Sequence, residues 1–226
     1  TAFKCKPDAA LLKELRDEIG PAIDIGVHCH GEFTPAEALT LSDDLRPYKP
    51  AFLEEPTNPD DLAALKWLGE RTRVPLAAGE RLFSRWGLRE LLETRAIAIA
   101  QPEITRIGGI TEMKKVATLC EAFGVMLAPH DGSTGPIAEM ANLHVLATTP
   151  NLLYLEHRAR DVFWRREVVQ GVLLDQAGYI TLGDKPGLGL VLDQEAIKKY
   201  PVKEYGDFNY EYEDEIAINR RRKGTD

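Results

Sequence analysis

The stretch Ala51-Phe52-Leu53-Glu54-Glu55-Pro56 combines a short apolar run, two adjacent carboxylates and a proline. A buried parallel strand reads as a continuous hydrophobic run, and proline, which has no backbone N–H, marks the point where such a strand ends. The two glutamates therefore lie at the carboxyl end of a predicted strand, where open α/β sheets and βα barrels carry their chemistry. Taken alone, the same stretch reads more often as an acidic turn that faces solvent.

The same shape recurs three times in the chain, and this recurrence changes the interpretation. Val27-His28-Cys29-His30, residues 76–80 and residues 125–130 are each an apolar run that ends in a side chain of metal-ligand or acid–base type. Neighbouring strand ends in a sheet lie about 5 Å apart. The repeated pattern therefore favours one shared site over several unrelated turns.

Strands and helices alternate along the first 155 residues of the chain. This alternation predicts a parallel sheet of seven strands, and the lack of a topological switch favours a barrel over an open sheet. A complete (β/α)8 barrel needs about 250 residues, so the chain is expected to begin inside the repeat, without its first strand. The predicted strands are residues 1–6, 23–29, 52–54, 76–78, 97–101, 125–128 and 152–155, and the predicted helices are residues 8–19, 35–45, 60–70, 84–93, 111–123 and 136–147.

Helix-end signals support these boundaries, and the pattern changes after the seventh strand. Ser84 is a predicted N-cap and Gly124 a predicted C-cap. Residues 1–157 are expected to form the barrel, and residues 158–203, with a short helix at 193–200, to complete it. The tail, residues 204–226, is acidic and tyrosine-rich and then basic, which we interpret as a packing arm or frayed terminus.

Composition limits the classes of partner. The chain has 226 residues with 44% hydrophobic content and a net charge of −8, which argues against a nucleic-acid groove or an anionic membrane surface. No apolar run approaches the roughly 20 residues that span a bilayer, and no signal peptide opens the chain. The three cysteines, Cys5, Cys29 and Cys120, lack CxxC spacing. This sparse, odd set fits a reducing cytoplasm, so we expect a cytoplasmic protein.

Two groups of side chains are candidates for chemistry. His28 and His30 are two apart on a predicted strand, so both point to one face of the sheet. A divalent ion bridging His28, Glu54 and Glu80 would relieve the repulsion between clustered carboxylates.

The second group contains a possible base. His130 follows another strand and is suited to act as a base near neutral pH, with Glu103 on an adjacent strand end to orient it. Arg106 is expected to form the turn before the next helix. Glu156, after the last strand, is expected to hydrogen-bond a substrate or protonate an intermediate.

The order of these motifs resembles the enolase superfamily, and within it the mandelate racemase subgroup and its galactonate dehydratase-like sugar-acid dehydratases. Residues 77–85 resemble that family's signature at this strand, residues 185–189 resemble its C-terminal turn, and the likeness runs to about Tyr200. The ordered motifs are Lys4-x-Lys6, His28-x-His30, Glu54-Glu55-Pro56, Gly79-Glu80, Pro102-Glu103 with Gly108-Gly109, Pro129-His130 and Glu156.

The resemblance implies a modified TIM barrel of (β/α)7β type whose N-terminal capping domain is missing from this chain. It also implies a Mg²⁺ site with ligands at His28, Glu54 and Glu80. Position 28 is ordinarily Asp in this family, and imidazole suits zinc, nickel or iron better than Mg²⁺. Mn²⁺ or another divalent ion is therefore the alternative to Mg²⁺. The apolar surface left by an absent cap makes a homo-oligomer the expected state.

The resemblance further assigns the catalytic residues. It implies His130 as general base with Glu103 as its orienting partner, His30 as the acid that assists loss of the 3-hydroxyl, and Lys6 as a base on the opposite face. Glu156 matches a carboxylate that contacts the intermediate. Position 103 is ordinarily Asp, and the extra methylene of Glu is expected to strain the His130–Glu103 pair.

The expected activity is dehydration of an aldonate to a 2-keto-3-deoxy acid. The proton α to a carboxylate is very weakly acidic, so its removal needs a divalent ion and a positioned base. Reprotonation from Lys6 would instead give a racemase or epimerase of the same fold. A third alternative is a non-catalytic or regulatory homologue that binds a sugar acid, and the departures at positions 28 and 103 motivate it.

Overall fold

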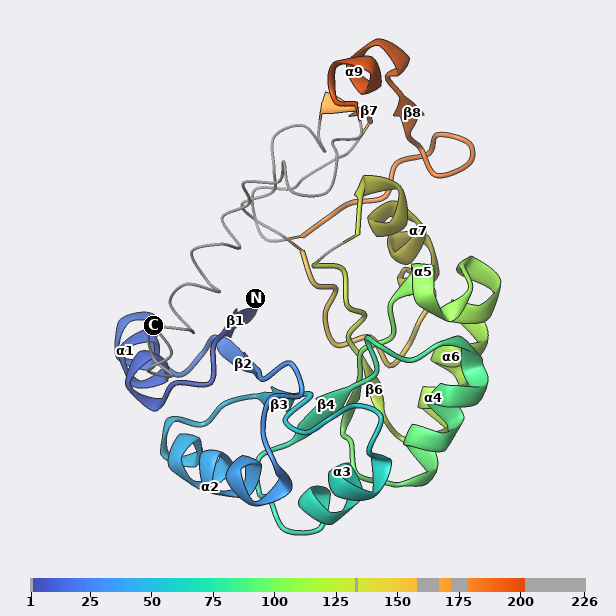
Figure 1. Cartoon of the computed structure of the whole chain (residues 1–226). Helices are drawn as coiled ribbons and strands as arrows, with labels where there is room; N and C mark the ends of the chain where they lie inside the picture. The colour runs from blue at the N-terminus through green and yellow to red at the C-terminus, as the bar shows by residue number, and fades with distance from the viewer. Residues whose placement is uncertain (1, 133, 158–166, 172–178, 202–226) are drawn as a thin grey trace.

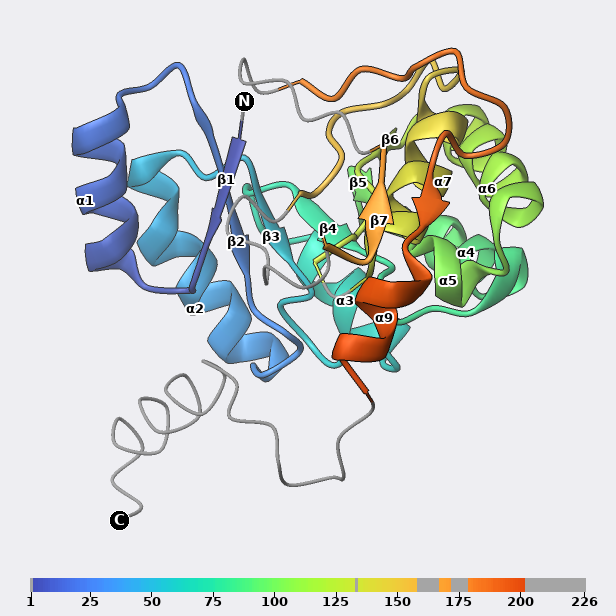
Figure 2. The ribbon, with the colours of Figure 1, turned by 90° about the horizontal axis from the view of Figure 1, so that it is seen from above.

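The computed structural model describes residues 2–132, 134–157, 167–171 and 179–201. Its centre is a six-stranded parallel sheet in the order β1-β2-β3-β4-β5-β6. The sheet curls, and the helices cover its outer face (Figures 1 and 2). Strand order equals chain order, so the sheet has no switch point, as predicted. The strands are β1 (Ala2–Cys5), β2 (Asp24–His28), β3 (Phe52–Glu54), β4 (Leu76–Ala78), β5 (Ile99–Ala100) and β6 (Met126–Leu127).

The helices that follow the strands start and stop close to the predicted positions. Asp8 caps the first helix through the N–H groups of Ala10 and Leu11, and Thr34 forms a capping box with Glu37. Gly124, in the left-handed region, ends the longest of them. The helices are α1 (Ala9–Ile19), α2 (Pro35–Leu45) with the 3-10 turn η1 (Arg46–Tyr48), α3 (Leu62–Gly69), α4 (Ser84–Glu93), α5 (Ile104–Ile107), α6 (Ile110–Phe123) and α7 (Pro136–Leu146).

Three local predictions need correction. Ser84 is the first residue of α4 and not its N-cap, which is Phe83, although the Ser84 hydroxyl accepts the Trp86 N–H at 3.4 Å. The short helix α5 was not predicted, because four residues carry too little periodicity. The seventh strand is reduced to one parallel bridge between Leu127 and Leu152.

The described part of the sheet is therefore a half-barrel. Two side-chain contacts span the gap between its first strands and the segment after the Leu152 bridge. The Tyr154 hydroxyl donates to Asp24 of β2, and Lys4 of β1 reaches Glu156. Residues from opposite ends of the sheet are brought together in this way.

Alternation along the strands divides the core into two layers. Leu53 belongs to the large cluster between sheet and helices, whereas Phe52 belongs to a small cluster on the inner face with Ala77, Ile99 and Ala128. Gly26 on the neighbouring strand leaves room for the Phe52 ring, because a Cβ there would lie 2.3 Å from its ζ carbon. Since residues two apart share a face of a strand, Glu54 at the end of β3 lies on the same inner face as Phe52.

The C-terminal part adds a small antiparallel pair and a helix. Strand β7 (Val169–Gln170) pairs with β8 (Val191–Leu192), and α9 (Gln194–Lys199) follows with Asp193 as its N-cap, close to the predicted helix at 193–200. The predicted tail, residues 204–226, lies outside the described residues. In the part of the chain that the structure describes, no helix is long and apolar enough to cross a membrane.

Candidate active site

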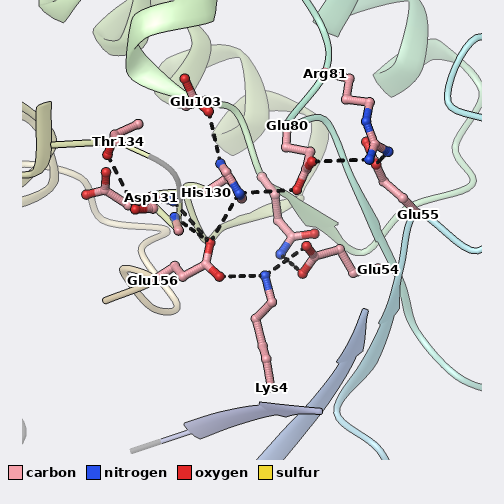
Figure 3. Close-up of polar contacts among 12 residues, drawn as sticks. Lys4, Glu54, Glu55, Glu80, Arg81, Glu103, His130, Asp131, Thr134 and Glu156 are labelled. Carbon is pink, nitrogen blue, oxygen red and sulfur yellow. Dashed lines mark hydrogen bonds and ion pairs between the residues drawn. The ribbon is translucent and has the colours of Figure 1, made fainter. Parts of the chain in front are cut away.

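Five predicted side chains from well-separated parts of the sequence meet at the carboxyl ends of the strands (Figure 3). Glu54 ends β3, and Glu80, Glu103 and His130 follow β4, β5 and β6 within three residues. The Nε2 atom of His130 lies 3.4 Å from Glu80 Oε2 and 3.7 Å from Glu156 Oε2. Parallel strands carry these residues to one rim, so the prediction that they converge is confirmed.

His130 and Glu103 form the predicted pair. His130 Nδ1 lies 3.1 Å from Glu103 Oε2, and the Thr105 hydroxyl donates to the other oxygen of Glu103. The extra methylene of Glu at this position therefore does not separate the pair. A carboxylate on Nδ1 fixes the orientation of the imidazole and stabilises its protonated form, and it leaves Nε2 facing the rim.

Arg106 supports this pair, a role that the sequence interpretation as a turn residue missed. Its guanidinium donates to the backbone carbonyl of Glu80 at 2.9 Å, and its Nε lies 3.4 Å from Glu103 Oε2. One side chain thus ties the end of β4 to the carboxylate after β5. The signal was present in the sequence, because Arg106 stands three residues after Glu103 at the start of a helix.

Lys4 stands between two carboxylates on the opposite side of the rim. Its Nζ lies 2.8 Å from both Glu54 Oε1 and Glu156 Oε1. Burial by itself lowers the pKa of Lys4, but the charges of Glu54 and Glu156 outweigh it and the net pKa is raised. Gln101 Nε2 donates to the second oxygen of Glu54 at 2.6 Å. Both oxygens of Glu54 therefore already have a donor.

Glu156 is held in its ionised form. Burial would raise its pKa, but Lys4, His130 and the Asp131 N–H lower it below the usual range. The N–H groups of Asp131 and Gly132 donate to Glu156 Oε2 at 3.0 and 3.2 Å. Of the two roles predicted for Glu156, these contacts favour accepting hydrogen bonds over protonating an intermediate.

Glu55, the second carboxylate of the Glu54-Glu55-Pro56 motif, received no separate role from the sequence. Glu55 is 2% exposed and forms an ion pair with Arg81, whose Nη2 lies 3.7 Å from Glu80 Oε1. Burial first, and then the charges of Glu80 and Glu54, raise the pKa of Glu55 to about 7 against the opposing effect of Arg81. Arg81 therefore links Glu55 to the rim carboxylate Glu80.

His28 and His30, at and just beyond the end of β2, differ from the prediction in one respect. His28 is the last residue of β2 and pairs in register with Glu54, but His30 lies beyond the strand, exposed and with a left-handed φ of 52°. The assignment of His30 to the strand is therefore wrong, although its ring centroid lies 4.5 Å from that of His28. Lys6 lies one residue beyond β1 and is half-buried.

The expected metal ligands are not gathered into a formed metal cage. Within the described residues, no group of three or more His, Cys, Asp or Glu side chains is arranged to hold a metal ion. The donor chemistry nevertheless fits a divalent cation, because Glu54 and Glu80 are only 2% and 7% exposed and buried carboxylates need a positive partner. One cation, the Lys4 ammonium, already stands against Glu54.

The curated relatives of this chain include two sugar-acid dehydratases. A D-xylonate dehydratase of Haloferax volcanii is 33% identical over 85% of this chain and 47% of its own length. A D-galactonate dehydratase of Cronobacter sakazakii is 37% identical over 85% of this chain and 52% of its own. The chain thus spans about half the length of the curated relatives it matches.

Solved structures show the same fold. The mandelate racemase/muconate lactonizing enzyme of Jannaschia sp. CCS1 superposes with a TM-score of 0.85 at 33% identity, over 91% of this chain and 57% of that one. The enzyme of the same description from a Sulfitobacter species gives 0.86 at 30% identity, over 91% and 56%. The family model described as Enolase C-terminal domain-like matches residues 1–196. The chain therefore belongs to this family of the enolase superfamily.

Proposed function

We propose that this chain is the catalytic part of a metal-dependent sugar-acid dehydratase. The observation that carries the proposal is the His130–Glu103 contact of 3.1 Å, which presents Nε2 of the imidazole to a rim of buried carboxylates. The relatives named for D-xylonate and D-galactonate dehydration indicate the substrate class, an aldonate. The product is the corresponding 2-keto-3-deoxy acid.

His130 removes the proton α to the substrate carboxylate. Glu103 holds Nδ1 and stabilises the imidazolium that forms, and Arg106 keeps Glu103 in place. A base is effective when it is fixed within reach of its proton and its charged form is stabilised. Glu156 and the N–H groups that fix it define the side of the rim opposite Glu80.

His30 is proposed to complete the elimination. Its proton goes to the 3-hydroxyl, which leaves C3 as water, while the electron pair from the broken C2–H bond forms the C2–C3 double bond. The resulting enol becomes the 2-keto-3-deoxy acid by gaining a proton at C3 and losing the proton of its C2 hydroxyl. Lys6 stands as the base for the opposite face, the position from which an epimerase would reprotonate C2.

A divalent cation would be held by Glu54 and Glu80, with His28 as the third donor. When bound, Mg²⁺ or Mn²⁺ supplies positive charge for the negative charge that develops on the substrate carboxylate. The remaining expectations, a cytoplasmic location, a homo-oligomer and no nucleic-acid or membrane partner, are part of the same proposal.

The test is a screen of aldonates, including D-xylonate and D-galactonate, with Mg²⁺, Mn²⁺ or Zn²⁺. The expected result is a 2-keto-3-deoxy acid, detected by its carbonyl derivative. Exchange of the C2 proton with deuterium, without loss of water, would assign the racemase or epimerase alternative. Thermal stabilisation by one sugar acid, without exchange or product, would assign the non-catalytic alternative.

A further inference from the structure

The contacts of Glu54 pose a conflict with its proposed role as a metal ligand. Lys4 Nζ lies 2.8 Å from one oxygen of Glu54, and Gln101 Nε2 lies 2.6 Å from the other. Figure 3 shows Lys4 between Glu54 and Glu156. A divalent ion at Glu54 would share these two oxygens with their donors, and it would repel the ammonium at close range.

The Lys4 ammonium neutralises the buried carboxylate of Glu54. The Glu54 side chain is 2% exposed, and a buried carboxylate without a cationic partner is costly. Gln101 supplies a neutral donor only, whereas Lys4 brings a positive charge into direct contact with Glu54. Lys4 thus offsets the cost of burying the Glu54 carboxylate.

Lys4 can also leave Glu54 without losing all of its favourable contacts. Its side chain is 23% exposed, and its second partner, Glu156, is 22% exposed. Loss of the contact to Glu54 therefore leaves the ammonium paired with Glu156 and in reach of water. The same displacement is much less favourable for a fully buried lysine, which would lose its only partner.

We propose that Lys4 occupies the cation position at Glu54 and that a divalent cation binds there by displacing it. The inference rests on the proposed metal site and adds an internal competitor to it. Affinity for the metal is set by the difference between metal coordination and the Lys4–Glu54 ion pair. Removal of the ammonium is therefore expected to tighten metal binding and to destabilise the metal-free protein.

The test measures Mn²⁺ binding to the full chain by calorimetry and by the electron paramagnetic resonance signal of free Mn²⁺. Lys4→Met is expected to bind Mn²⁺ on the order of tenfold more tightly than the unaltered chain. Its melting temperature without metal is expected to fall and its rise on adding Mn²⁺ to be larger. Lys4→Gln, which keeps a polar head without charge, is a second variant if Lys4→Met does not fold.

Two controls separate direct competition from net charge. Lys13→Met removes the same charge from an exposed pair with Asp17 on α1 and is expected to leave Mn²⁺ affinity within about twofold. Lys4→Arg keeps the charge and is expected not to tighten binding. Equal or weaker binding by both uncharged Lys4 variants would overturn the inference while leaving the metal site intact. Absence of Mn²⁺ binding in every variant would overturn the inference and the proposed metal site together.

Discussion

Glu103 Oε2 is shared between the imidazole of His130, at 3.1 Å, and the guanidinium of Arg106, whose Nε lies at 3.4 Å. The single oxygen therefore lies within ion-pair distance of both side chains. Arg106 also holds the carbonyl of Glu80, so the position of the base depends on two strand ends at once. This coupling leads to one prediction for the His130–Glu103 pair and another for Arg106, which supports the pair.

The His130–Glu103 pair is expected to control proton abstraction. His130→Asn removes the base, and Glu103→Gln keeps the side-chain length but loses the charge that stabilises the imidazolium. Each is expected to lower the rate by about 10²-fold or more. The measurement is exchange of the C2 proton of the active aldonate with deuterium, followed by NMR. Glu93→Gln, in an exposed i,i+4 pair with Arg89, is the matched control, and an equal loss in that variant would contradict the assignment.

Arg106 is expected to act by positioning. Arg106→Lys keeps one positive charge but cannot reach both the Glu80 carbonyl and Glu103, because an ammonium lacks the planar fork of a guanidinium. The turnover number is expected to fall about 10- to 100-fold, with little change in KM. Steady-state kinetics of Arg106→Lys beside Arg89→Lys, an exposed arginine on α4, provide the comparison. A rise in KM at constant turnover would assign Arg106 to substrate binding.

Local sequence signals were sufficient for most of the fold. The helix over Pro35–Leu45 and the strand over Phe52–Glu54 have the predicted bounds, because capping residues and buried apolar runs act over a few residues. The prediction of a strand at 152–155 failed because apolar residues alone do not show whether a neighbouring strand is placed to pair with them. Among the described residues of this segment, only Leu152 makes a β-bridge, to Leu127, although the Leu153 N–H also donates to the Leu127 carbonyl.

The candidate site was predictable to the extent that strand ends decide it. Glu54, Glu80 and His130 follow directly from apolar runs that end in polar side chains. The position of Lys4 does not, because its two partners are 50 and 152 residues away in sequence. Long, flexible side chains that bridge distant strands are fixed by the curled geometry of the sheet and not by any local pattern.

The fit between Gly26 and Phe52 gives a prediction for the fold itself. Gly26→Ala would place a methyl group 2.3 Å from the Phe52 ζ carbon, and such overpacking costs about 1–3 kcal/mol. Denaturant unfolding is expected to show this loss, and the double variant Gly26→Ala/Phe52→Leu to recover part of it. Gly87→Ala in α4, where the nearest atom lies 3.9 Å away on Leu82, is the control and is expected to be neutral or stabilising. Equal effects at the two glycines would contradict the inner packing.

The raised pKa of Asp131 predicts that this residue makes stability depend on pH. Burial raises the pKa of this carboxyl from 3.8 to about 8, and the nearby charges of Glu139 and Glu156 add to the rise. Between these two values Asp131 holds a proton in the folded chain that it has lost in the unfolded chain, so its contribution to the free energy of unfolding falls as pH rises from about 4 to about 8.

Asp131→Asn removes this penalty, since an amide does not ionise. The variant is expected to gain stability over the unaltered chain as pH increases from about 5 to about 8, with each pH unit in that window corresponding to at most about 1.4 kcal/mol. Urea unfolding at the two pH values measures the difference. Asp17→Asn, whose carboxylate is exposed on α1, should show no such gain. A stability difference for Asp131→Asn that stays constant or shrinks with pH would contradict the raised pKa. It would mean that the buried carboxyl ionises at its ordinary pKa, because its surroundings stabilise the ionised form in place of water.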